Sequence, residues 1–246
     1  MRVKANLRFE EISKVPYNHL FELMSASLNK IGEVSPDLAY KYHEKPKYKP
    51  YNLSWINVDV KKTDKHGITP KNSKANYYFS SPKKELTKSF VEGFLENPEL
   101  TIKKQKDIKF KLDSIQSLEE PKFEEKMVFE TITPIAVRTQ TKNGDGELKT
   151  IDLRPNSKKF YDNLFQNLIN RYKDYYDKEP KKDLNELDFR FIDSKPKRLK
   201  IKDTWQMSTQ MKFEINATEQ INRFIYYTGL GERNNQGFGC LKAISN

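Results

Sequence analysis

The 246-residue chain contains one cysteine, Cys240, and three histidines. A single cysteine excludes a disulfide framework and a zinc site built from several thiolates. Apolar runs are also short, and none approaches the roughly 20 residues that a transmembrane helix needs. The first residues, MRVKANLRFEEI, lack the hydrophobic centre of a signal peptide. We therefore expect a soluble, cytoplasmic protein that makes no use of a membrane.

Acidic residues are outnumbered, with 34 Asp and Glu against 45 Lys and Arg and a formal net charge of +11. A basic surface attracts polyanions such as nucleic acid or an acidic membrane. A lysine-rich chain with a well-solvated surface has the same composition, so charge favours a nucleic-acid partner and does not prove one. The length allows one large domain or two small ones.

Glycine is scarce as well, yet four of the nine glycines lie in the stretch GLGERNNQGFGCLK near the end of the chain: Gly229, Gly231, Gly237 and Gly239. A dinucleotide fingerprint would need glycine where Asn234 stands, and a Walker loop would need Lys-Ser/Thr after Gly239. Two interpretations remain. The stretch is either a helix C-cap at Gly229 with tight turns, or a loop whose exposed backbone amides and Arg233 approach phosphates.

Hydropathy periodicity predicts the same order of elements in both halves of the chain. The first half is expected to contain a strand at 1–11, helices at 19–31 and 35–42, strands at 51–60 and 75–80 joined by a turn region, a helix near 86–95 and an alternating segment at 100–118. After a linker at 119–125 (EEPKFEE), the second half is expected to contain a strand at 126–139, a helix capped by Asn156, strands at 187–192 and 197–215 with a break near Asp203, a helix at 219–227 and a strand at 239–244. Each half reads βαββαβ. This order predicts an α+β fold of two tandem ferredoxin-like (RRM-like) domains, 1–122 and 123–246.

The glycine stretch, with its pattern G-h-G-x5-G-h-G (h hydrophobic) after a helix, resembles the RAMP superfamily of CRISPR-associated proteins. Other segments match in order and spacing: VPYNH at 15–19, LA at 38–39 before HE at 43–44, TPIAV at 133–137 and KPKR at 195–198. The resemblance covers essentially the whole chain and is closest to the CRISPR repeat-RNA processing endoribonuclease. It implies that the protein binds CRISPR repeat RNA and cuts precursor transcripts into guide RNAs. It also implies metal-free cleavage by 2′-OH attack, leaving 2′,3′-cyclic phosphate and 5′-OH ends.

The three histidines differ in context. His66 lies in a polar turn (TDKHGITP), where we expect a surface residue, and His19 begins an amphipathic helix, where we expect a structural role. His43 lies in AYKYHEKPKYK, among tyrosines and lysines. Metal-free RNA cleavage needs a base for the 2′-OH proton, a cation for the phosphorane oxygens and an acid for the leaving 5′-oxygen. Histidine, lysine and tyrosine can supply these functions, and this segment holds all three.

The resemblance maps the catalytic histidine onto His43 and the accompanying lysine onto Lys49, with Lys47 as the alternative. It also implies a tyrosine on the first helix in some members, and Leu28 occupies that position. Either Tyr40 or Tyr42 then replaces that tyrosine, or His43 acts with lysine alone. No acidic stretch has ligand-like spacing, so we expect no metal and no cofactor.

The basic residues most suited to holding RNA lie in one predicted strand, where Lys197 and Leu199 alternate with Arg198 and Lys200: the candidates there are Lys195, Lys197, Arg198 and Lys200. An edge strand that lysines protect from aggregation would show the same sequence pattern. The KPKR match favours RNA contact, and Arg138, Arg233 and the four glycines of the stretch are further candidates. Leu28 keeps a second hypothesis open, a non-catalytic RAMP subunit of a CRISPR effector complex. Whether the chain acts alone, as a homodimer or with other effector subunits stays open as well.

Overall fold

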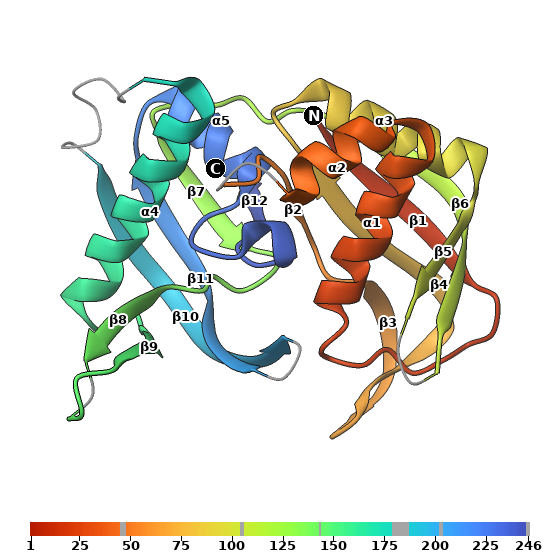
Figure 1. Ribbon diagram of the computed structural model, residues 1–246, viewed down its shortest axis with the longest axis horizontal. Coiled ribbons are helices and arrows are strands. Elements are labelled where there is room, and N and C mark those ends of the chain that lie inside the picture. The colour runs from red at the N-terminus through yellow and green to blue at the C-terminus, as the bar shows by residue number, and fades with distance from the viewer. Residues whose placement is uncertain (45–47, 104–105, 143, 179–186, 202–203, 245–246) are drawn as a thin grey trace. The chain divides into compact units, whose positions relative to one another are not determined.

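The computed structural model describes residues 1–44, 48–103, 106–142, 144–178, 187–201 and 204–244 (Figure 1). The chain forms two compact units. The first comprises Met1–Glu120 with Asn235–Gly237, and the second comprises Pro121–Asn234 with Phe238–Asn246. Among the described residues, no helix is both long enough and apolar enough to cross a membrane.

The first unit is an antiparallel sheet with helices on one face. Its elements are β1 (Arg2–Phe9), α1 (Leu20–Val34), α2 (Pro36–Glu44), β2 (Asn52–Leu53), β3 (Asn57–Asp64), β4 (Gly67–Ser80), α3 (Lys84–Glu96), β5 (Glu99–Ile102) and β6 (Ile108–Ser117). The strand order is β2-β4-β1-β6-β5, and β3 pairs with β4. The alternation predicted for β1 is confirmed, because Val3, Ala5, Leu7 and Phe9 are all buried in the core.

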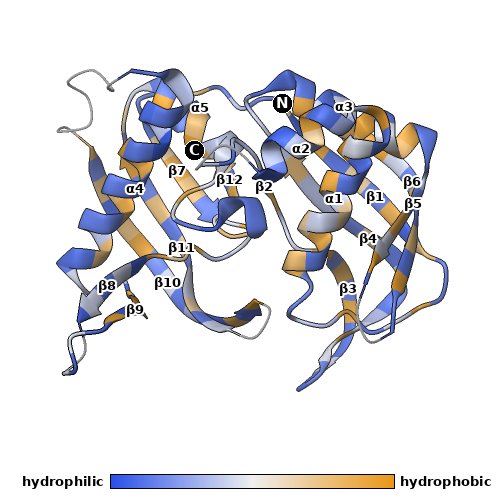
Figure 2. Cartoon of the chain, in the orientation of Figure 1, coloured by the Kyte–Doolittle hydropathy of each residue, from blue (hydrophilic) through white to orange (hydrophobic). Residues whose placement is uncertain are grey.

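The second unit repeats this plan. Its elements are β7 (Lys126–Thr131), β8 (Arg138–Lys142), β9 (Leu148–Asp152), α4 (Lys158–Tyr176), β10 (Asp188–Ile201), β11 (Thr204–Asn216), α5 (Glu219–Thr228), the 3₁₀ turn η2 (Asn234–Gln236, of which 235–236 group with the first unit) and β12 (Leu241–Ile244). The sheet order is β10-β11-β7-β12, with β8 and β9 forming a separate hairpin. Hydrophobic and hydrophilic residues alternate along the strands of both sheets (Figure 2).

Strand order confirms the predicted fold class. In the first unit, β1 lies in the sheet between β4, the strand before helix α3, and the last long strand, β6. In the second unit, β7 likewise lies between β11, the strand before helix α5, and the last strand, β12. This is the ferredoxin-like βαββαβ arrangement, present here twice in tandem.

Three local predictions were wrong. The expected turn region after 60 is a two-stranded ribbon of β3 and β4, which turns only at 65–66. The predicted strand at 126–139 ends at Thr131, and the β8–β9 hairpin was missed. Both ribbons are largely solvent-exposed, so neither carries the apolar alternation that marks a half-buried strand. Helix α4 is capped one residue later than expected, by Ser157, whose hydroxyl accepts a hydrogen bond from the Phe160 N–H.

Candidate functional site

The end of α2 brings together a histidine and a lysine. The His43 side chain is exposed at the last turn, with Nδ1 3.0 Å from Glu44 Oε1. The Lys49 ammonium donates a hydrogen bond to the main-chain oxygen of His43 at 2.8 Å. The last carbonyls of a helix lack intrahelical partners, so a cation there caps the helix and lies at the negative end of its dipole. The fold therefore places the Lys49 ammonium against the backbone of His43.

Burial lowers the pKa of Lys49, and the nearby Glu44 carboxylate opposes that shift. The alternative lysine, Lys47, lies outside the described residues. Lys49 is thus the lysine for which the structure gives a position, half-buried and fixed against the backbone of the histidine.

The two candidate tyrosines have opposite environments. Tyr40 is 69% exposed and stands three residues before His43, so both side chains lie on the same helix surface. Tyr42 is buried in the core of the first unit, and burial, reinforced by Glu85, raises the pKa of its hydroxyl. Leu28 is also buried there, on α1. Of these residues, only Tyr40 presents a hydroxyl to solvent beside His43.

The other two histidines lie where the sequence predicted. His19 is buried, with Nδ1 2.6 Å from the Pro16 carbonyl and Nε2 accepting a hydrogen bond from the Ile56 N–H at 3.0 Å. Because both ring nitrogens bond to the main chain, His19 connects three segments of the first unit. His66 is exposed in the β3–β4 turn.

Several backbone amides of the glycine stretch are bonded within the protein, which bears on the two interpretations of the sequence. All four glycines are buried and have φ between +66° and +87°. The N–H groups of Gly229, Leu230, Glu232 and Gly239 each donate to a main-chain carbonyl, on Ile225, Gly239, Ala136 and Pro134 respectively. The expectation of phosphate-binding amides is thus wrong for these groups. The helix C-cap interpretation fits instead, since α5 ends at Gly229.

Close packing of this segment excludes side chains at two of the glycines. A Cβ on Gly239 would lie 1.9 Å from the Leu230 oxygen, and a Cβ on Gly231 would lie 2.7 Å from the Ala136 oxygen. The Asn234 amide closes the loop by donating to the carbonyls of Leu230 and Phe238, both at 3.1 Å. Asn234, which stands where a dinucleotide fingerprint would need glycine, therefore holds the two ends of the loop together through these hydrogen bonds.

Arg171 on α4 anchors the same loop and was not singled out from the sequence. Its guanidinium donates to the carbonyls of Thr228 at 2.8 Å, Gly229 at 3.0 Å and Gly231 at 3.4 Å. The residue is 5% exposed. An arginine within an apolar helix stripe is a usable sequence signal, because a buried charge requires partners.

Two predicted RNA-binding arginines belong to this region: Arg233 lies within the loop, and Arg138 is bonded to it. Arg138 is held by Glu232: its Nε donates to Oε2 at 2.7 Å, and its N–H donates to Oε1 at 2.7 Å. Arg233 has φ +56° and is half-buried, and burial together with Arg138 lowers the pKa of its guanidinium. Arg138 thus joins β8 to the glycine segment.

The KPKR residues lie on β10, which runs without the break expected between 192 and 197, and β10 is an edge strand of its sheet. Lys195 and Arg198 are exposed, and Lys197 and Lys200 are half-buried. None of these four cations forms an ion pair with a residue that the structure describes. Arg198 instead lies over the indole of Trp205, 4.5 Å from the ring centroid, and Trp205 is 53% exposed. Trp205 was not a sequence candidate, although an exposed aromatic beside a basic strand is a recognisable RNA-binding signal.

Two family models cover nearly the whole chain. CRISPR-associated protein Cas6, N-terminal, matches residues 14–116, and CRISPR associated protein Cas6, C-terminal, matches residues 118–243. The CRISPR-associated endoribonuclease Cas6 1 of Methanocaldococcus jannaschii is 35% identical over 242 residues, which cover 98% of this chain and 92% of that protein.

Solved structures share the fold over the full length. One, described as the characterization of a Cas6-related gene from Pyrococcus furiosus, has a TM-score of 0.91 and 31% identity, and the match covers 100% of this chain and 99% of that one. Another, described as an RAMP protein binding different RNA substrates, has a TM-score of 0.89 and 28% identity over 100% of both chains. These matches agree with the motifs and with the two ferredoxin-like units, and the chain belongs to the Cas6 family of CRISPR-associated endoribonucleases.

Proposed function

We propose that this protein binds CRISPR repeat RNA and cuts precursor CRISPR RNA once per repeat, without a metal ion, by attack of the RNA 2′-OH on the adjacent phosphate. The observation that carries the proposal is the pairing at the end of α2, where the Lys49 ammonium bonds to the carbonyl of the residue bearing the exposed His43 imidazole. The M. jannaschii relative is named an endoribonuclease, which supports the reaction class.

In the proposed reaction, His43 removes the proton of the 2′-OH. With its proton on Nδ1, the ring donates to Glu44, and Nε2 is left to accept the proton. The 2′-oxygen attacks phosphorus, and the phosphorus–5′-oxygen bond breaks. A proton must then reach the leaving 5′-oxygen, and the exposed Tyr40 hydroxyl is the donor we assign. The products are a 2′,3′-cyclic phosphate and a 5′-OH.

Lys49 supplies the positive charge. Negative charge grows on the non-bridging oxygens as the phosphorane forms, and a nearby ammonium stabilises that charge more than it stabilises the ground state. Its bond to the His43 carbonyl fixes the cation relative to the base. In the second unit, the β10 side chains of Lys195, Lys197, Arg198 and Lys200 hold the RNA backbone.

The test is cleavage of end-labelled repeat RNA in EDTA. We expect one cut, a cyclic phosphate terminus, and no cut when the scissile nucleotide carries a 2′-deoxy sugar. Replacing His43 by Ala should slow the cut by on the order of 10²- to 10⁴-fold with binding nearly unchanged. His66→Ala is the matched control, since His66 is exposed in a distant turn and should cut at the normal rate.

The other outcomes each reject a part of the proposal. Cleavage of the 2′-deoxy RNA would mean that water is the nucleophile. Equal rates for His43→Ala and the unmodified protein would remove His43 from the reaction. Tight binding of repeat RNA with no cut at all would assign the protein to the second hypothesis, a non-catalytic RNA-binding subunit.

A further inference from the structure

One face of the β10–β11 hairpin carries a pocket that the proposed cleavage does not use. Residues paired directly across two antiparallel strands share a face of the sheet. Phe213 and Met211 belong to the core of the second unit, and they pair across the strands with Phe191 and Ser194. These four residues therefore lie on the side of the sheet that faces the helices. The same side continues along the hairpin through the pairs Pro196–Thr209, Arg198–Met207 and Lys200–Trp205.

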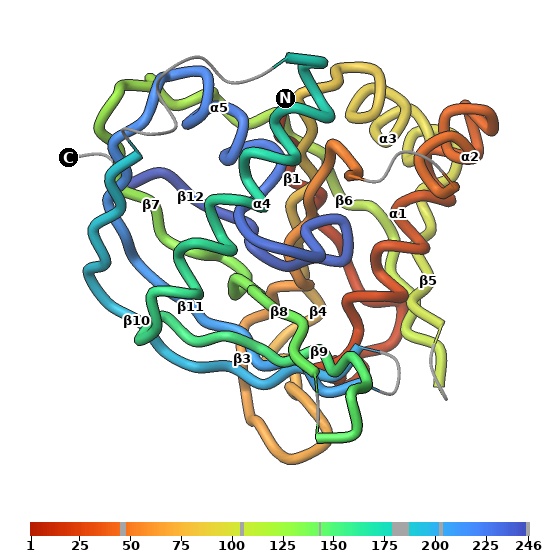
Figure 3. The backbone as a smooth tube through the Cα atoms, turned by 60° about the vertical axis from the view of Figure 1, so that its left-hand side comes forward, coloured from red at the N-terminus to blue at the C-terminus, as the bar shows by residue number. Residues whose placement is uncertain are grey.

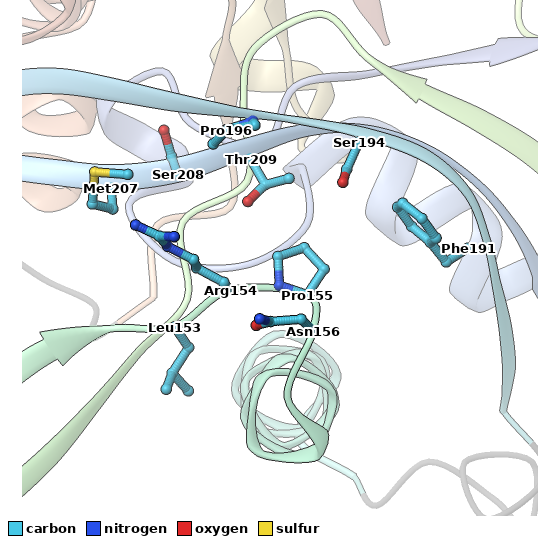
Figure 4. Close-up of a pocket in the computed structure, with 10 residues that line it drawn as sticks. All are labelled: Leu153, Arg154, Pro155, Asn156, Phe191, Ser194, Pro196, Met207, Ser208 and Thr209. Carbon is cyan, nitrogen blue, oxygen red and sulfur yellow. The ribbon is translucent and has the colours of Figure 1, made fainter.

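The pocket lies between this face and the turn that leads into α4 (Figure 4). Its volume is about 280 Å³. Pro155 and Asn156 of the turn face Thr209 and Pro196 of the strands, and Phe191, 40% exposed, lies at one end. Arg154 and Met207 lie at the other end.

The wall of the pocket is fixed from both sides. Asp152, at the end of β9, accepts a hydrogen bond from the Met207 N–H at 2.7 Å and another from the side-chain amide of Gln206. Figure 3 shows β9 beside the distal part of β10 and β11. On the other side, the Ser157 N–H donates to the Arg154 carbonyl at 3.2 Å, where α4 begins. Because hydrogen bonds hold both the strand side and the helix side of the pocket, the pocket is formed before a ligand binds.

The shape and chemistry of the pocket fit one nucleobase. Pockets for drug-sized ligands occupy about 300–1,000 Å³, so this one suits a smaller molecule. Proline and phenylalanine rings offer flat apolar surface, while Asn156, Ser194 and Thr209 offer hydrogen-bonding groups for a base edge. Apart from Arg154 at one end, the residues that line the pocket are uncharged, which suits a neutral base flanked by phosphate better than a phosphate alone.

The surroundings are positively charged. Neither Arg154 nor Arg198 forms an ion pair with a described residue. The indole of Trp205 holds the Arg198 guanidinium 4.5 Å from its centroid, which orients that charge at the side of the pocket lined by Met207. Two residues along a strand span about 7 Å, so Trp205 lies one such step from Met207. A base in the pocket would thus place its flanking phosphates near fixed cations.

We propose that this pocket receives the base of one unpaired nucleotide of the bound RNA, with Arg154 and Arg198 binding the phosphates on either side of it. The proposal rests on the proposed function only in taking RNA as the ligand. It assigns to the second unit a contact with a base, beyond the phosphate contacts of the β10 lysines.

The experiment measures binding and not cleavage. Of the two tryptophans, Trp55 and Trp205, the first is replaced by Phe, so that the fluorescence of Trp205 reports RNA arriving beside the pocket. The probes are 12-nucleotide oligoadenylate and oligouridylate and a 12-nucleotide RNA backbone without bases. Ser194→Phe fills the pocket from an exposed position. Gln210→Phe is the matched control, since Gln210 pairs with Lys195 on the opposite face of the same hairpin.

We expect Ser194→Phe to weaken binding of at least one of the two base-containing RNAs by roughly 5- to 100-fold, the range found for loss of one base contact. Binding of the base-free RNA, and binding of all three probes by Gln210→Phe, should change by less than about twofold. Ser194→Leu should give a smaller loss of the same kind, which separates filling of the pocket from damage to the fold.

The proposal is overturned if both base-containing RNAs bind the two Ser194 variants as tightly as the control, or if the base-free RNA loses affinity equally. Either result would show that the pocket does not receive a base of the RNA. Cleavage is scored separately with repeat RNA. Loss of base-dependent binding without any cleavage by the wild type would retain the pocket and reject the nuclease, and normal cleavage without base dependence would do the reverse.

Discussion

Arg171 provides the sharpest test of how the glycine segment is held. Replacing Arg171 by Met keeps the length and the apolar stem of the side chain on α4 and removes its guanidinium. The carbonyls of Thr228, Gly229 and Gly231 then lose a charged donor inside the protein. We expect the second unit to lose stability and the segment at 228–231 to open first.

The magnitude follows from these contacts. A hydrogen bond to a charged group contributes about 1.5–3 kcal/mol, and the two short ones, at 2.8 and 3.0 Å, dominate. Two such bonds together contribute about 3–6 kcal/mol, and the apolar stem that Met retains places the loss in the lower part of this range. We therefore expect Arg171→Met to lower the free energy of unfolding by about 3–5 kcal/mol.

The assay is urea unfolding together with amide hydrogen exchange at 228–231. The matched control is Lys159→Met, an exposed position on the same helix, which should change stability by less than about 0.5 kcal/mol. If Arg171→Met unfolds within about 1 kcal/mol of this control and exchange at 228–231 is unchanged, Arg171 does not hold the loop and the reasoning is refuted.

Three further predictions concern the glycine loop, the cation Lys49 and the RNA-binding surface. Gly239→Ala should cost about 2–4 kcal/mol, from its φ of +66° and the Leu230 oxygen, while Gly144→Ala, which meets nothing within 4 Å, should cost less than about 0.5 kcal/mol; equal thermal melting of the two would contradict the packing. Because burial lowers the pKa of Lys49, its ammonium is lost at lower pH than that of a free lysine, and cleavage should fall on the alkaline side of the pH–rate profile. Lys49→Arg keeps the charge and should move that fall to higher pH, and an unchanged alkaline limb would exclude Lys49 as the cation. Arg198→Ala should reduce the slope of log affinity against log salt by about 0.7–1, as one lost phosphate contact requires, and an unchanged slope would remove Arg198 from the interface.

The elements that the sequence predicted well are those with one buried face. The alternation of Val3 to Phe9 and the 3.6-residue stripe of α4 each reflect contact with a core, and both were read correctly. The β3 ribbon and the β8–β9 hairpin were not, since their side chains meet solvent on both faces. Periodicity records burial, and it is silent where a strand is stabilised by main-chain bonds alone.

The candidate site shows the same division. The sequence brought His43 and Lys49 to one short segment, and the fold joins them through a helix-capping bond. Spacing did not separate Tyr40 from Tyr42, because that depends on which face of α2 packs against the core. The sequence did not separate the two interpretations of the glycine stretch for a related reason. The partners of the Glu232 and Gly239 amides, Ala136 and Pro134, lie about a hundred residues earlier in the chain, where no local pattern reveals them.

This correction changes where the charge for RNA binding has to come from. Had the loop presented free amides, its backbone dipoles would bind phosphate and the loop itself would carry much of the affinity. The amides of Gly229, Leu230, Glu232 and Gly239 are bonded to main-chain carbonyls, Arg138 is paired with Glu232, and Arg171 is buried against the loop carbonyls. Among the cations considered in the second unit, Arg154 and the β10 residues Lys195, Lys197, Arg198 and Lys200 form no ion pair with a described residue, so we expect them to contact phosphate. It follows that substitutions of the glycines should reduce RNA binding only as far as they unfold the second unit, whereas substitutions on β10 should reduce it, and its salt dependence, in a protein that remains fully folded.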